Sequence, residues 1–144
     1  MELPFGIVED DPGVNSAANQ GMWAEIFAYP AYLLTDPRLR WEAVNGDTAR
    51  LNVPYQDGEQ EFTVEFDPQS GMISRFETLR YRDEKLGKVL WWGDFYYGEG
   101  ANGAPVFEKL TATWEDEGTP WLIVNFEEIV FNSDVSQYIR QKGP

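Results

Sequence analysis

The strongest constraint on the fold of this chain is an alternation of apolar and polar residues, with a period of two, that begins at Leu39. Its clearest stretch is Glu-Phe-Thr-Val-Glu-Phe at residues 61–66. Such alternation is typical of strands with one buried and one exposed face. Turn sequences such as Asn45-Gly46-Asp47 separate the segments and favour antiparallel hairpins. The pattern predicts seven strands, at residues 39–44, 48–55, 61–66, 72–82, 88–97, 105–115 and 120–131.

A helical pattern precedes the strands. Within residues 15–34, Met22 and Ile26 have the i, i+4 spacing of one helix face, and Asn15 or Ser16 is expected to cap the helix. Pro at position 30 is expected to end or kink it. The sequence therefore predicts one helix before the sheet.

These patterns predict a single α+β domain over residues 1–144. One helix against seven antiparallel strands gives a curved meander, or half-barrel, with a concave face that is only partly filled. The expected parts are an irregular arm at 1–14, the helix at 15–34, the sheet at 39–131, and a tail at 132–144 with a short helical turn at 135–139.

Composition excludes several kinds of function. The chain has no Cys and no His, which rules out a thiolate nucleophile, a cysteine-held metal and a Ser-His-Asp triad. Its 25 acidic and 11 basic side chains give a net charge of -14, which repels nucleic acid and anionic membranes. We expect no metal, no cofactor, no catalytic residues, no nucleic-acid binding and no membrane insertion.

The first residues, MELPFGIVEDDPG, lack the basic start and the long apolar run of a signal peptide. No apolar stretch is long enough to span a membrane. As written, the chain is expected in the cytoplasm.

Aromatic residues are unusually frequent, with six Trp, seven Tyr and nine Phe. Core packing explains any one ring. Together, the rings exceed what one helix can cover, so some should line a cavity or an interface for an apolar partner. The residues expected to line a ligand site are Trp23, Phe27, Trp41, Phe76, Arg80, Arg82, Trp92, Tyr96 and Trp114.

The adjacent residues Trp91 and Trp92 fall within a predicted strand. Neighbouring strand residues point to opposite faces, so the two rings cannot share one core. Phe95 and Tyr97 lie on the face of Trp91, and Asp94 and Tyr96 on the face of Trp92. Either both faces of this strand are covered, or one of them presents a binding site.

Arg80 and Arg82 are two residues apart and therefore share a strand face, where Glu25 of the helix could pair with them. A carboxylate among arginines is either a structural ion pair or part of an anion-holding site.

No spacing of acidic residues favours acid–base catalysis. Glu127 and Glu128 are adjacent on a predicted strand and point apart, whereas a glycosidase needs two facing carboxylates. Because tryptophans suit sugar stacking, a carboxylate-based glycoside hydrolase remains an alternative.

Short motifs spread along the chain resemble a known family. They are Gly21-x-Trp23-Ala24-Glu25, Pro30 before Leu33-Leu34, Arg40-Trp41-Glu42-Ala43-Val44, Phe66-Asp67, Gly71-Met72-Ile73, Arg80-Tyr81-Arg82, Trp92 with Tyr96-Tyr97, Trp114, and Phe131-Asn132-Ser133-Asp134-Val135. Over residues 4–144 their order resembles a family of uncharacterised bacterial and archaeal proteins, distantly similar to the LolA/LolB-like half-barrel lipoprotein carriers. The resemblance implies a curved sheet around a helix, an apolar concavity and no catalytic residues.

We therefore expect a non-catalytic protein that binds an apolar small molecule, or the acyl chain of a lipid, in the concave face of the sheet. The main alternative is a protein–protein interaction or homodimerisation module, in which open strand edges and aromatic surface pair with another chain.

Overall fold

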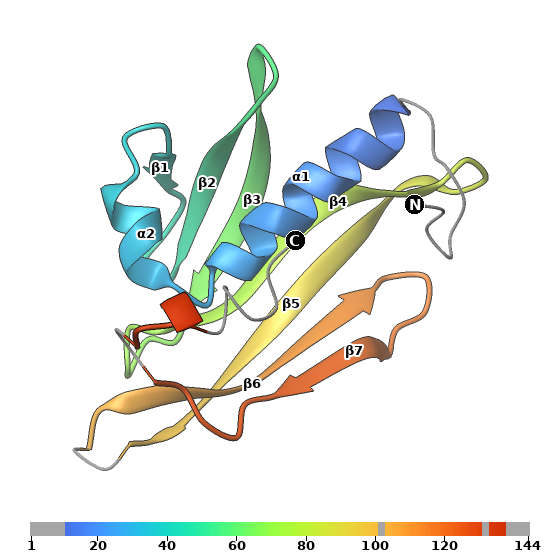
Figure 1. Cartoon of the computed structure of the whole chain (residues 1–144). Coiled ribbons are helices and arrows are strands. Elements are labelled where there is room, and N and C mark those ends of the chain that lie inside the picture. Colours follow the sequence, from blue (N-terminus) through green and yellow to red (C-terminus); the bar gives the residue numbers. More distant parts are fainter. Residues whose placement is uncertain (1–10, 101–102, 131–132, 138–144) are drawn as a thin grey trace.

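The computed structural model describes residues 11–100, 103–130 and 133–137, in which two helices precede one seven-stranded sheet (Figure 1). Every neighbouring pair of strands is antiparallel, and the strands lie in sequence order in an open sheet. This confirms the α+β class and the meander. The elements are α1 (Pro12–Ile26), α2 (Pro30–Thr35), β1 (Arg40–Ala43), β2 (Thr48–Tyr55), β3 (Gly58–Phe66), β4 (Ile73–Asp83), β5 (Gly87–Glu99), β6 (Pro105–Trp114) and β7 (Pro120–Asn125).

Helix α1 begins three residues before the predicted start. Asp11 is the N-cap, and its Oδ1 accepts hydrogen bonds from the backbone N–H groups of Gly13 (2.7 Å) and Val14 (3.0 Å). Pro12 occupies the first turn, where its missing N–H costs no helical hydrogen bond. The predicted caps at Asn15 and Ser16 therefore lie inside the helix. The predicted arm is described only from Asp11 onward.

The predicted helix at 15–34 is two helices. α1 ends at Ile26, and α2 starts with Pro30. Proline lacks an N–H and forces the residue before it out of helical geometry, and Tyr29 accordingly has φ -124° and ψ 68°. The chain therefore bends between α1 and α2. The predicted helical turn at 135–139 extends beyond residue 137 and so lies partly outside the described residues.

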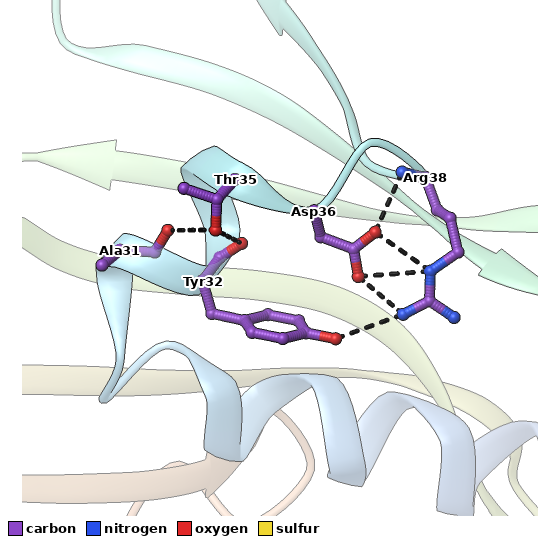
Figure 2. A network of polar contacts seen from close by, with 5 residues as sticks. All are labelled: Ala31, Tyr32, Thr35, Asp36 and Arg38. Carbon is purple, nitrogen blue, oxygen red and sulfur yellow. Dashed lines mark hydrogen bonds and ion pairs between the residues drawn. The ribbon is translucent and has the colours of Figure 1, made fainter.

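A polar network holds the end of α2 and the turn that follows it (Figure 2). Thr35 Oγ1 donates to the carbonyl of Ala31 (2.9 Å), and Arg38 Nη2 donates to the hydroxyl of Tyr32 (3.2 Å). The guanidinium of Arg38 also binds both carboxylate oxygens of Asp36, and these bonds hold the pKa of Asp36 well below its usual range. The network fixes α2 relative to the start of β1.

The core lies between α1 and the strands that α1 crosses. Phe27 stacks on Phe76, with their ring centroids 4.9 Å apart, and Phe62 meets both rings edge-on. On the α1 side of β2 and β3, the central residues Leu51, Val53, Phe62 and Val64 are fully buried, as the alternation predicted. The buried apolar residues are Trp23, Ala24, Phe27, Leu33, Leu51, Val53, Phe62, Val64, Ile73, Phe76, Trp91, Phe95, Ala112 and Trp114.

Strands β3 and β4 separate beyond the pair Thr63 and Glu77, and α1 lies over the place where they diverge (Figure 1). Gln20 of α1 bridges toward β4: its Nε2 donates to Thr78 Oγ1 (2.8 Å) and to the carbonyl of Leu79 (3.0 Å). Buried polar groups need such partners, so these bonds set the position of α1 on the sheet.

Because α1 packs mainly on β4 and β2, the last strands are less covered. Trp121, Leu122 and Ile123 of β7 are all exposed. Across the described ranges, neither helix is long and apolar enough to cross a bilayer.

Candidate functional site

Two apolar pockets lie where α1 meets α2. One, of about 390 Å³, lies between the end of α1 and β6 and is lined by Phe27, Val106 and Phe107 among others. The other, of about 210 Å³, lies between α2 and the sheet and is lined by Trp41 and Phe66 among others. The lining of both is mainly apolar, which is typical of sites for small apolar ligands.

The two pockets share Pro30, Met72 and Tyr97, and we call them together the helix-junction groove. The bend at Pro30 separates α1 from α2 and leaves this space above the sheet. Burial raises the pKa of Tyr97 to about 12, which indicates poor solvation on this side of the groove. Trp41 Nε1 donates to the carbonyl of Leu33 (3.0 Å), so one wall of the groove is held in place.

A third pocket, of about 150 Å³, lies between α1 and the uncovered strands β6 and β7, and we call it the Arg80 pocket. Its lining includes Gly21, Ala24, Glu25, Arg80, Trp91 and Leu122. It combines apolar side chains with one cation.

Arg80 lies against two neighbouring rings, those of Trp91 and Trp114, whose centroids are 6.0 Å apart. Its guanidinium carbon lies 4.3 Å from the ring centroid of Trp91 and 5.4 Å from that of Trp114, and its Nε donates to the carbonyl of Ala17 (3.1 Å). Burial lowers the pKa of Arg80 from its ordinary value, although arginine stays charged. The side chain is therefore a fixed, partly desolvated cation.

Arg82 lies on the same face but has a different environment. It stacks on Trp114 at 4.6 Å and pairs with Asp116 and Glu117. Neither arginine forms an ion pair with Glu25 in the described part of the chain, although Glu25 lines the Arg80 pocket. The expected pairing of Glu25 is therefore not observed. The alternation explains why both arginines face α1, since Phe76 and Thr78 on the same side of β4 are buried.

Four of the aromatic residues predicted for the site are core residues. Trp23, Phe27, Phe76 and Trp114 are at most 6% exposed. Phe27 nevertheless contributes to the groove and Phe76 to the Arg80 pocket, because a pocket wall is also the edge of a core.

Trp92 and Tyr96 lie on the sheet face away from α1. Trp92 is half-buried beneath Arg75, 5.4 Å from the guanidinium carbon, and Lys109 Nζ lies 4.0 Å from the ring centroid of Tyr96. Trp91 lies on the face of β5 toward α1, so the two adjacent tryptophans point to opposite faces of the strand. The structure thus does not bring Trp92 and Tyr96 together with the other predicted site residues.

The predicted site residues Phe27 and Trp41 do line the groove, but sequence reasoning missed the three residues that its two pockets share. Pro30 was interpreted only as a helix stop, and Met72 only as the start of a strand. Tyr97 was assigned to the face of Trp91 and Phe95, which was the available signal. No pattern in the sequence shows that Pro30 and Tyr97, far apart in the chain, line one space.

The acidic residues do not form an acid–base pair in these pockets. The Arg80 pocket contains one carboxylate, and the groove none. A polar pocket of about 310 Å³ at the β3–β4 divergence includes three glutamates but no tryptophan, and each glutamate pairs with an arginine. Within residues 11–100, 103–130 and 133–137, no group of three acidic residues has the geometry to hold a metal ion.

No curated protein and no solved structure matched this chain. One family model, described as a family of unknown function (DUF6544), matches residues 4–126. That range contains the Arg80 pocket and the residues that line the groove except Ile129, and the match brings no link to the LolA/LolB-like carriers. Because the match spans most of its length, the chain belongs to this family of unknown function, DUF6544.

Proposed function

We propose that the protein binds an apolar small molecule in the helix-junction groove. The observation that supports this most directly is the groove itself, two adjoining pockets that share Pro30, Met72 and Tyr97 and are lined mainly by apolar side chains. Burial of apolar surface stabilises a complex by roughly 25 cal/mol per Å² before the cost of association, so such a groove favours an apolar occupant.

A flat apolar surface would not select a ligand, but this groove has fixed walls. Trp41 is hydrogen-bonded to α2, and the polar network of Asp36 and Arg38 holds the turn after α2. A preformed site loses less entropy on binding. The acyl chain of a lipid is one ligand of this class.

The test is a titration of the purified protein with a fluorescent fatty acid, together with mass spectrometry of its organic-solvent extract. The variant Met72→Gln places an amide in the wall shared by both pockets, which we expect to weaken binding about tenfold because the amide loses water without gaining a partner. The matched control is Leu79→Gln, since Leu79 is 59% exposed and lines neither pocket of the groove.

Two results would contradict the proposal. One is an empty extract combined with no saturable signal. The other is an equal loss of affinity in Met72→Gln and in Leu79→Gln.

A second function, self-association, is favoured by the edge strand β7. Its sequence, Pro-Trp-Leu-Ile-Val-Asn, contains no charge, and Trp121 and Ile123 are more than half exposed. Protein edge strands usually carry charges that prevent pairing with another chain. Size-exclusion chromatography with light scattering tests this: a dimer that Ile123→Lys converts to a monomer supports pairing through β7, and a monomeric wild-type protein excludes it.

A further inference from the structure

The starting point is an arginine without a carboxylate partner. Of the six arginines that the structure describes, five pair with Asp or Glu: Arg38, Arg40, Arg50, Arg75 and Arg82. Arg80 has no such partner in these ranges, although the chain carries 25 acidic side chains. Partly buried charges are normally paired, so the exception requires an explanation.

The free donors of Arg80 point to a missing acceptor. A guanidinium has five N–H donors, and the one observed hydrogen bond of Arg80 uses Nε, which donates to Ala17. The neighbouring rings of Trp91 and Trp114 restrict where the group can lie. Among the described residues, no carboxylate or other acceptor pairs with its Nη atoms, and a planar fork of this kind suits a carboxylate or a phosphate.

Helix α1 leaves room for this arrangement. A Cβ atom at Gly21 would lie 3.2 Å from Arg80 Nη2, so a larger side chain would push the guanidinium aside. Gly21 also lines the Arg80 pocket. The glycine therefore lets the cation lie against the helix at the pocket wall.

The Arg80 pocket lies close to the helix-junction groove. Ala24, near the end of α1, lines the former, and Ala28, in the turn that follows α1, lines the latter. On β6, Leu110 lines the Arg80 pocket and Phe107 lines the groove. One elongated molecule would therefore reach from one site to the other past the end of α1.

We propose that Arg80 binds the oxyanion head group, a carboxylate or a phosphate, of an amphiphile whose apolar part lies in the helix-junction groove. For the apolar part, this inference rests on the proposed function. Glu25 opposes the anion electrostatically from the pocket wall, so Glu25→Gln should tighten binding.

The experiment compares three ligands of equal chain length, dodecanoate, dodecyl phosphate and dodecanol, by calorimetry and by the fluorescence of Trp91 and Trp114. The wild-type protein should bind at least one anion about tenfold more tightly than the neutral alcohol, as a charge-assisted hydrogen bond predicts. The two anions separate a carboxylate site from a phosphate site.

Arg80→Met should abolish the preference for the anion and leave dodecanol affinity unchanged. The matched control is Arg82→Met, on the same strand face and stacked on the same Trp114, but already neutralised by carboxylates. Its preference should stay within about twofold of wild type. If Arg80→Met fails to fold, Arg80→Lys replaces it: the charge remains but the fork is lost, so the preference should fall severalfold.

The outcomes separate the two proposals. Equal affinity for dodecanol and both anions, or a preference that survives removal of Arg80, overturns the role of Arg80 while the groove keeps its apolar ligand. Failure of all three ligands to bind overturns both.

Discussion

The two halves of the sheet differ in pattern and in surroundings: β2 and β3 alternate apolar and polar residues, whereas β7 is an almost continuous apolar run. In β2 and β3, the side chains of Leu51 and Phe62 that face α1 are 0% exposed, whereas in β7 Leu122 is 37% exposed. The difference follows from size. A helix is about 10–12 Å wide with its side chains, and strands are about 4.8 Å apart, so α1, which packs mainly on β4 and β2, cannot reach across a seven-stranded sheet to β7.

This difference teaches where function can reside in a fold of this kind. The covered half contributes to stability, because its apolar residues are already buried by the chain itself. Trp91 and Phe95 of β5 and Ala112 and Trp114 of β6 are buried as well, but β7 keeps exposed apolar surface, and two of the pockets discussed above lie beside β6. Substitutions in the two parts of the sheet should therefore differ in their effects.

The largest effect should come from one substitution made in each half. Leu51→Ala removes a fully buried side chain and should lower the free energy of unfolding by about 2–5 kcal/mol. Leu122→Ala, at a 37% exposed position, should cost less than about 1 kcal/mol. Urea unfolding of both variants is the measurement. Equal costs would mean that β7 is covered, and the division would be wrong.

The next effect concerns β5, between the two halves. A Cβ atom at Gly93 would lie 2.5 Å from Cε1 of Phe76, so Gly93→Ala must displace a core ring and should cost about 1–3 kcal/mol. Gly46→Ala, where no atom lies within 4 Å of the added methyl group, is the control and should change stability by less than about 0.5 kcal/mol. Thermal unfolding of both variants measures the difference, and an unchanged melting temperature for Gly93→Ala would contradict the described packing.

A smaller effect should come from the start of the covering helix. Asp11→Ala removes the acceptor of two backbone hydrogen bonds and should destabilise the protein by about 1 kcal/mol. Asp11→Ser, which preserves a capping oxygen, should recover most of the loss. Hydrogen exchange of the first turn of α1 distinguishes local fraying from a global effect, and unchanged exchange in Asp11→Ala would show that the cap contributes nothing.

The smallest expected effect is a pH-dependent change in stability that depends on Tyr97 of the groove. The folded protein holds the pKa of Tyr97 at about 12, above its ordinary value of 10.0, because burial disfavours the phenolate. The contribution of this burial to the free energy of unfolding is complete below pH 10 and is lost as the pH rises toward 12. For a partly buried ring the loss is about 1 kcal/mol or less. Tyr97→Phe should remove this part of the alkaline destabilisation. An unchanged pH profile would indicate that Tyr97 is well solvated.

The fold was largely predictable because strand alternation and turn residues are local signals. Residues 61–66 and 48–55 were predicted as strands, and they fall in β3 and β2. The predicted helix start is too late because Asn15 and Ser16 are as suitable for an N-cap as Asp11 is. At Pro30 the sequence allows either the end of the helix or a kink in it, and only the structure distinguishes the two.

The site was less predictable, because a pocket depends on contacts between distant segments. The sequence indicated that rings were in excess but not which of them the helix would bury. Trp23 and Phe76 became core, whereas Pro30, Met72 and Tyr97 came together from three separate segments. Arg80 was recognised from its spacing to Arg82, but its lack of a carboxylate partner is a property of the folded chain.

Amide hydrogen exchange with and without saturating dodecanoate tests the division of the sheet most directly. We predict slower exchange in the second half of α1, in α2 and in the strand segments around Phe66, Tyr97 and Phe107, with no change in β2. Protection spread evenly over the sheet, or confined to β2, would contradict the assignment of ligand binding to the helix-junction groove.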